Sequence, residues 1–123
     1  MAKSTILKNT QHKVLWENNS PSSTFDLQYI NLNDSLANYQ YIMVAFARSK
    51  SGDNYQSTGF IPVNFDFVNL EAQIGGYFCS RSLRPNTNSQ LIAADCKKVS
   101  SYGSTTETTA NDFIIPRQII GIK

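Results

Sequence analysis

The chain has 123 residues, of which 41% are hydrophobic and 16% are charged, and its formal net charge is +2. This length predicts a single domain over residues 1–123, with one core and no separate catalytic lobe. The basic residues are scattered, and Lys97-Lys98 is the one adjacent Lys/Arg pair, which argues against a nucleic-acid partner. No apolar run reaches the roughly 20 residues of a membrane helix, and the opening lacks the core of a signal peptide. We therefore expect a soluble protein that is made in a cytoplasm and not inserted into a membrane.

The charged fraction is low for a globular protein, and short polar residues are frequent instead: the chain contains 12 Asn, 14 Ser and 9 Thr. Their side chains bond to nearby backbone and favour turns and strand edges. An N-terminal arm at about residues 1–13 is expected to be loosely held. After it, the alternation of Phe25, Leu27 and Tyr29 predicts a strand with these side chains on one face. The phase slip at Ile30 predicts that this strand bulges or ends early.

The clearest strand pattern is ANYQYIMVAFARSK, in which Ile42, Val44 and Phe46 form an apolar face. The residues between them are small or amphipathic, which predicts a central strand covered on both sides. The next ten residues, KSGDNYQSTG, consist of turn-forming types and predict an exposed loop. In the segment FIPVNFDFVNL, Pro62 lacks the amide hydrogen for a sheet ladder, so an edge strand or a bulged strand is predicted there.

The best hairpin candidate is GGYFCSRSLRPNTNSQLIAADCKK, whose two apolar-alternating arms flank the turn residues 85–89. If this hairpin is centred between residues 87 and 88, Cys79 lies opposite Cys96, close enough for a disulfide. In a cytoplasmic product, reduced thiols that pack as small hydrophobes are the favoured alternative. The same register sets Leu83 opposite Ile92 and Arg81 opposite Ala94.

The remainder of the chain is one polar loop and one apolar strand. SSYGSTTETTAND predicts a long loop, and FIIPRQIIGIK predicts a final strand that must be buried within the sheets. Seven or eight short strands with turns at this spacing predict an all-β fold, a two-sheet antiparallel β-sandwich of jelly-roll-like kind.

The sequence offers little material for catalysis. His12 is the only histidine, so any triad would depend on it. The acids are single residues in neutral surroundings, and none forms a preferred pair for glycoside hydrolysis: Asp53, Asp66, Glu71, Asp95, Glu107 and Asp112. Two cysteines with no histidine nearby do not suit zinc, and isolated acids do not suit calcium. We predict no enzyme activity, no catalytic residue, no metal and no cofactor.

Several aromatic and aliphatic residues are candidates for contact with partners. Asn54, Tyr55 and Tyr102 lie in polar loops rich in Ser, Asn and Gly, a composition suited to surface recognition. Ordinary exposed loop tyrosines would show the same pattern. Trp16 is interpreted first as a core or inter-subunit residue and second as a ligand platform. We place three further residues in the core or between subunits: Phe65, Phe67 and Ile120.

The two ends of the chain carry a resemblance. LWENNSPSSTFDLQYINLN and NDFIIPRQIIGIK resemble the opening and closing strands of a domain found in bacteriophage structural proteins of the tail-fibre, baseplate and head-fibre kind. The likeness spans residues 15–123 and rests on short motifs. It implies a β-sandwich without enzyme activity that often assembles as a homotrimer. Such domains commonly end longer fibres, whereas this chain starts at Met1, which favours a decoration, plug or fibre-base role.

Three hypotheses follow from the sequence. The first is a virion structural protein, located in the virion and synthesised in the bacterial host cytoplasm, that contacts copies of itself and other virion proteins, with a host-surface glycan or protein as a further candidate partner. The second is a carbohydrate-binding module that uses Trp16, Tyr55 or Tyr102 as stacking surfaces. The third is a hydrolase built on His12 and the loop acids.

Overall fold

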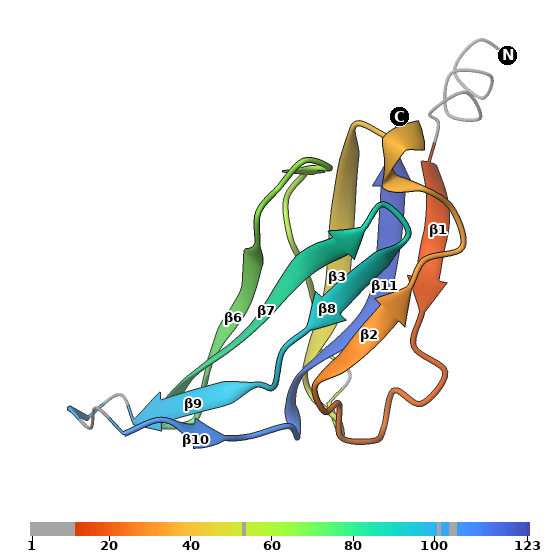
Figure 1. Cartoon of the computed structure of the whole chain (residues 1–123). Helices are drawn as coiled ribbons and strands as arrows, with labels where there is room; N and C mark the ends of the chain where they lie inside the picture. Colours follow the sequence, from red (N-terminus) through yellow and green to blue (C-terminus); the bar gives the residue numbers. More distant parts are fainter. Residues whose placement is uncertain (1–11, 53, 101, 104–105) are drawn as a thin grey trace, which may run out of the picture.

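The computed structural model describes residues 12–52, 54–100, 102–103 and 106–123. Within these ranges the protein contains eleven β-strands, one short 3-10 helix and no α-helix. Two antiparallel sheets pack against each other as a sandwich (Figure 1), which confirms the predicted fold class. The described residues hold more strands than the seven or eight predicted, because six of the strands have only two to four residues.

The first sheet is built around the last described strand. Its order is β1 (His12–Glu17), β11 (Phe113–Ile122), β3 (Tyr41–Ser49) and β4 (Tyr55–Ser57), and β5 (Ile61–Pro62) also pairs with β3. The predicted burial of the 113–122 segment is confirmed, since β11 lies between β1 and β3. The arm predicted for residues 1–13 lies outside the described residues up to residue 11, and the structure places His12 and Lys13 in β1 rather than in an arm.

The second sheet has the order β10 (Thr108–Thr109), β9 (Lys97–Ser100), β7 (Tyr77–Thr87), β8 (Gln90–Ala93) and β2 (Gln28–Asn31). β6 (Val68–Ile74) pairs with the other edge of β7, and the 3-10 helix η1 (Leu36–Asn38) follows β2. In Figure 1, β7, β8 and β2 cross in front of the first sheet, while β9 and β10 project beyond it at the lower left. We call β6, β9, β10 and the first half of β7 the wing.

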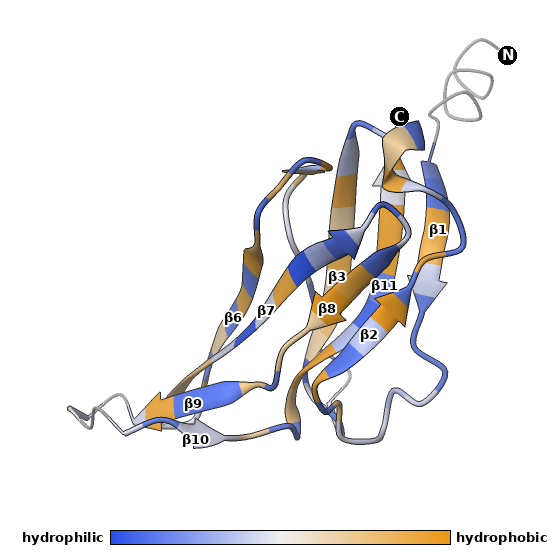
Figure 2. Ribbon diagram, in the orientation of Figure 1, coloured by the Kyte–Doolittle hydropathy of each residue, from blue (hydrophilic) through white to orange (hydrophobic). Residues whose placement is uncertain are grey.

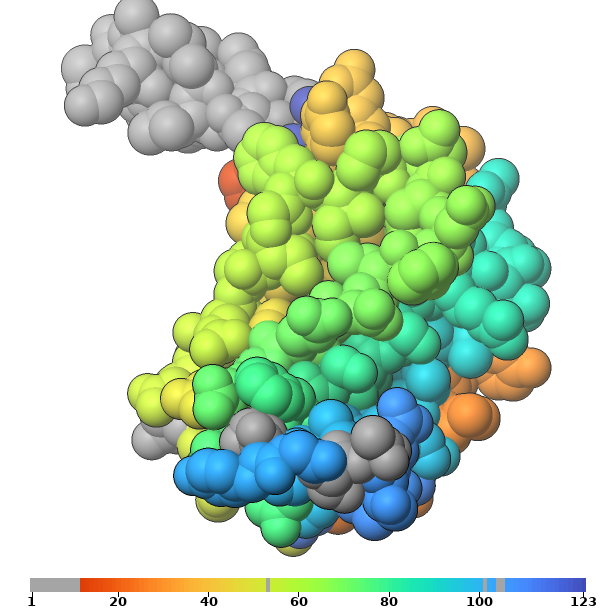
Figure 3. Space-filling view, turned by 90° about the vertical axis from the view of Figure 1, so that its left-hand side faces the viewer, coloured from red at the N-terminus to blue at the C-terminus, as the bar shows by residue number. Residues whose placement is uncertain are grey.

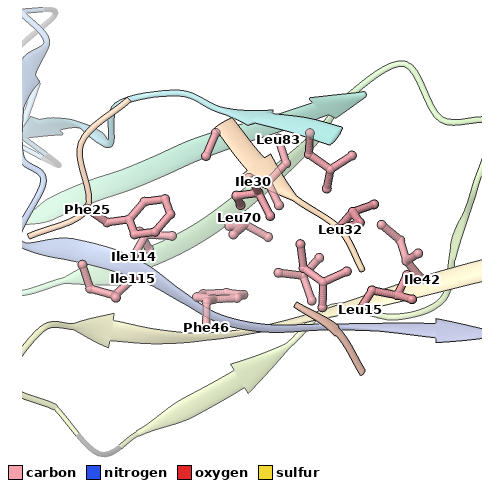
Figure 4. Packing of buried hydrophobic residues seen from close by; sticks show 14 of the residues in the cluster. Leu15, Phe25, Ile30, Leu32, Ile42, Phe46, Leu70, Leu83, Ile114 and Ile115 are labelled. Carbon is pink, nitrogen blue, oxygen red and sulfur yellow. The ribbon is translucent and has the colours of Figure 1, made fainter. Parts of the chain in front are cut away.

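The core lies between the two sheets. Figure 4 shows side chains from both sheets meeting there, among them Leu15 and Phe46 from the first sheet and Leu70 and Leu83 from the second. The alternation of apolar and polar residues along the strands is visible in Figure 2. Ile42, Val44 and Phe46 are buried as predicted. Each strand therefore contributes one face to the core and turns the other face outward.

Two sequence expectations on strand position are wrong. Leu27 and Tyr29 are 61% and 59% exposed, while Phe25 and Ile30 are buried, so the predicted face at 25–29 does not exist. The reason is that β2 begins only at Gln28, after an irregular segment in which Phe25 turns inward. The 60–70 segment is not one strand, because the chain leaves β5 at Pro62, crosses to the second sheet and starts β6 at Val68. The prediction that Pro62 marks an edge strand is confirmed, since β5 pairs only with β3.

Candidate functional site: an apolar sheet face and the pocket at its end

The outward face of the first sheet is apolar. Because Ile42 and Val44 point into the core, Tyr41 and Met43 point away from it. Met43 lies opposite Ile120, and the next strand brings Val14 to the same row. We call the following set the apolar face: Val14, Tyr41, Met43, Phe60, Ile120 and Ile122.

Each member of the apolar face retains contact with solvent. The five strand residues are half-buried, and Phe60, which stacks on Tyr41 with ring centroids 5.6 Å apart, is 61% exposed. The second sheet contacts the first from the opposite side, so none of its strands covers this face. A contiguous apolar surface of this kind is typical of sites that contact another protein.

A pocket of about 400 Å³ lies at one end of the apolar face. Its polar side chains are in contact with one another: Gln118 Nε2 donates a hydrogen bond of 2.8 Å to Glu17 Oε1. The Arg117 guanidinium carbon lies 5.3 Å from the ring centroid of Tyr55, a cation–π arrangement. Arg117 Nη2 donates a long bond of 3.4 Å to the carbonyl of Gly52, and the Arg117 Nε atom is buried without a partner.

The candidate recognition residues do not form one surface. Tyr55 belongs to β4, opposite Ala47, and not to a loop as predicted, because residues 55–57 of the predicted loop form a short strand that pairs with β3. Asn54 is exposed just before this strand. Tyr102 is 89% exposed and follows β9 in the other sheet. The structure therefore brings Tyr55 together with Arg117, which the sequence did not single out, and separates it from Tyr102.

The four packing candidates divide into two groups. Trp16 is half-buried against Phe25, with ring centroids 6.0 Å apart in an edge-to-face arrangement, and Phe65 also packs on the core. Ile120 belongs to the apolar face, and Phe67 is 63% exposed. Trp16 and Phe65 thus stabilise the fold, while Ile120 and Phe67 are available to a partner.

The predicted register of the two cysteines is wrong. Cys79 lies between Ala72 and Lys98, and Leu83 lies opposite Ala93 instead of Ile92. The hairpin turn is centred between residues 88 and 89 rather than 87 and 88, because Thr87 pairs with Gln90. A bulge between Pro85 and Thr87 then changes the register by one residue, and β8 ends before Cys96. Arg81 pairs with Leu70 on β6.

Both thiols are unbridged and buried. Burial raises the pKa of both thiols, that of Cys96 to about 11. They therefore pack as small apolar groups.

Several acids of the described segments accept hydrogen bonds that hold the fold together. Asp95 Oδ1 accepts hydrogen bonds of 2.8 Å from Asn111 Nδ2 and from the Leu27 amide, and these two bonds lower the pKa of Asp95. Asp53 lies outside the described residues. No group of three or more His, Cys, Asp or Glu able to hold a metal ion occurs in the part of the chain that is described. No helix in that part is long and apolar enough to cross a membrane.

Comparison with known proteins adds no relative: the chain matches no family model, no curated protein and no solved structure. Of the apolar face and its pocket, sequence reasoning singled out Ile120 and Tyr55 and missed the other residues, among them Arg117 and Phe60. Arg117 sits at a bulge between Pro116 and Gln118, where strict alternation fails, and Phe60 lies in an irregular segment. Neither carries a periodic signal.

Proposed function

We propose that the protein is a structural component of a bacteriophage particle, of the fibre, baseplate or head-decoration kind, that acts through protein–protein contacts. The observation that carries this proposal is the apolar face, which we assign to contact between copies of the chain. The resemblance of the segments around Trp16 and from Phe113 to Ile122 to bacteriophage structural domains supports it. That resemblance also leads us to propose a homotrimer that is located in the virion and made in the bacterial host cytoplasm.

Association through this face requires several apolar side chains to be buried together. Burying apolar surface contributes about 25 cal/mol per Å², while association costs about 4–15 kcal/mol in lost freedom of motion. One or two side chains are not enough to offset that cost. The apolar face offers three aliphatic side chains in one row, Val14, Ile120 and Met43, with the Tyr41–Phe60 aromatic pair beside them. The polar residues of the adjoining pocket, such as Glu17 and Gln118, suit the rim of an interface.

Oligomeric state and its response to substitution test the proposal. We expect size-exclusion chromatography with light scattering to show a trimer for the unchanged chain and a monomer for Ile120→Asp. The matched control is Ile92→Asp, which changes an equally half-buried isoleucine on the outward face of the second sheet. Ile92→Asp should remain a trimer.

A second pair of variants tests the proposal at exposed side chains, in case the variants at half-buried positions do not fold. Phe60→Asp changes a side chain that is 61% exposed, and Tyr29→Asp changes one that is 59% exposed on the other sheet. Phe60→Asp should dissociate the oligomer with an unchanged circular dichroism spectrum, whereas Tyr29→Asp should not. A strictly monomeric unchanged chain that also fails to bind particles would show that the proposal is wrong.

A further inference from the structure

A groove of about 440 Å³ lies on the wing, away from the apolar face. Cys79 points into the core, so its neighbours Phe78 and Ser80 on β7 point outward. The strand register places two rows across the groove, which are Gln73–Phe78–Val99 and Glu71–Ser80–Lys97. Figure 3 views the molecule from the β6 side, with β6 and β7 in green next to β9 in blue at the lower end.

The groove combines one aromatic ring with several hydrogen-bonding side chains. Phe78 is 52% exposed. Glu71, Gln73 and Glu107 are exposed at the groove, and neither glutamate belongs to an ion pair within the described residues. Lys97 Nζ donates a hydrogen bond of 2.8 Å to Thr109 Oγ1, which fixes the ammonium group at the β9–β10 side.

We propose that this groove binds a neutral oligosaccharide. A sugar ring presents an apolar CH face that can lie on Phe78, while its hydroxyl groups can bond to carboxylates, amides and the ammonium group around the ring. Two glutamates and two lysines line the groove, and Lys98 Nζ lies over the Tyr77 ring, 4.3 Å from its centroid. The lining therefore carries no excess of positive charge that would attract an acidic polymer. The volume falls in the range of about 300–1,000 Å³ usual for small-ligand sites.

The floor of the groove argues against an extended peptide. A peptide that adds to a sheet needs a strand with an unpaired backbone edge. At the groove, β7 is already paired on both sides, since Cys79 lies between Ala72 of β6 and Lys98 of β9. The ligand must therefore be recognised by side chains alone, which suits a saccharide.

Tyr102 extends the aromatic surface at the tip of the wing. A Cβ atom on Gly76 would lie 3.0 Å from Tyr102 Cε2, so the tyrosine ring rests against the β6–β7 turn. Its side chain is 89% exposed, and Gly76, which it contacts, lies two residues before Phe78 along the chain. A chain of two or more sugar units that lies on Phe78 can continue toward it.

The test is an array of neutral oligosaccharides and of oligosaccharides that contain uronic or sialic acid, followed by calorimetry with the best ligand. We expect a neutral sugar to bind and Phe78→Ala to weaken the binding at least tenfold. Glu71→Gln should weaken it severalfold, because a carboxylate accepts stronger hydrogen bonds than an amide. The matched control is Tyr29→Ala, which removes a similarly exposed aromatic ring from the same sheet face and should leave binding unchanged.

Any one of three results would overturn the proposal: no binding to any neutral sugar, a preference for the acidic sugars, or unchanged binding by the Phe78→Ala variant. Capture of a lysine-rich peptide with no sugar bound would instead identify the groove as a protein contact. Because the groove and the apolar face lie on different sheets, the outcome is independent of the oligomer experiment.

Discussion

Arg81 donates its Nε hydrogen to the carbonyl oxygen of Ile114 over 2.8 Å, and this bond joins the second sheet to the first. The same guanidinium group donates to the carbonyl oxygens of Ala94 at 2.6 Å and Phe113 at 3.2 Å. Arg81 is only 1% exposed and forms no ion pair within the described segments. Burial lowers the pKa of Arg81 to about 10, so the side chain stays charged at neutral pH.

The acceptor residue is itself unusual. Ile114 has a φ of 51°, the left-handed region that β-branched residues rarely adopt. Such a conformation costs about 1–3 kcal/mol and persists only when its surroundings fix it. The bonds from Arg81 to the carbonyls of residues 113 and 114 are the contacts that hold this part of β11 in place.

Arg81→Met tests the role of these bonds. The substitution keeps much of the side-chain volume but leaves three carbonyl groups without their donor, so we expect a loss of about 3 kcal/mol in the free energy of unfolding. Denaturant unfolding monitored by circular dichroism measures it. Arg84→Met, three positions along β7 on the exposed face, is the control and should change stability by less than about 0.5 kcal/mol. Equal stability of the two variants would contradict this role.

Gly121→Ala should destabilise the first sheet. A Cβ atom at this position would lie 2.8 Å from Tyr39 Cδ1 and 3.0 Å from Leu15 Cδ1, closer than packed atoms tolerate. We expect a loss of about 1–3 kcal/mol, seen as a lower melting temperature. Gly59→Ala, where no heavy atom lies within 4 Å of the added carbon, should leave the melting temperature unchanged or slightly raised. A neutral Gly121→Ala would mean that the Tyr39 ring can move aside.

The Asp34–Tyr39 hydrogen bond should make stability depend on acid pH. Tyr39 Oη donates to Asp34 Oδ2 over 2.7 Å, and with bonds from Asn38 and the Ser35 amide it lowers the pKa of Asp34 to about 2. Because the folded-state pKa lies below the ordinary value of 3.8, this stabilisation is present above about pH 4 and is lost as pH falls through 2. Tyr39→Phe keeps the ring and should raise the pKa of Asp34, as followed by NMR titration of the carboxyl carbon. An unchanged pKa would show that the remaining donors suffice.

The two cysteines should resist alkylation in the folded protein. Both are buried, and burial raises the pKa of each thiol, so the reactive thiolate is scarce at neutral pH. We expect a thiol-specific chromophoric reagent to label neither Cys79 nor Cys96 until guanidinium chloride unfolds the chain, and then to label both. Rapid labelling without denaturant would contradict the observed packing. Labelling of neither residue after unfolding would reveal a disulfide.

The sequence predicted those elements in which period-two alternation is regular. Ile42, Val44 and Phe46 point inward as expected, and the run from Phe113 to Ile122 is a buried strand. Alternation fails where the backbone departs from regular geometry, as at Ile114 and at the bulge next to Pro85. No local pattern reports either departure.

The candidate site was harder to predict because it depends on pairing between distant strands. Ile120 was singled out, but its neighbours Val14 and Met43 lie 106 and 77 positions before it along the chain. The groove residue Phe78 meets Val99 only through the pairing of β7 with β9. The periodicity of a single sequence predicts to which face of a sheet a side chain points, but it does not predict which residues of the neighbouring strands lie beside it.

The central position of β11 has a consequence for biosynthesis. β1 and β3 do not pair with each other. Among the described strands β1 pairs with β11 alone, and β3, which also pairs with β4 and β5, is joined to β1 only through residues 113–122. As the chain leaves the ribosome, Leu15, Ile42 and Val44 must therefore wait for nearly the whole polypeptide before they are covered. Such late closure of long-range contacts slows folding and exposes nascent strands to aggregation. Truncation before Phe113 should leave β1 without the strand that it pairs with and β3 without its longest partner strand.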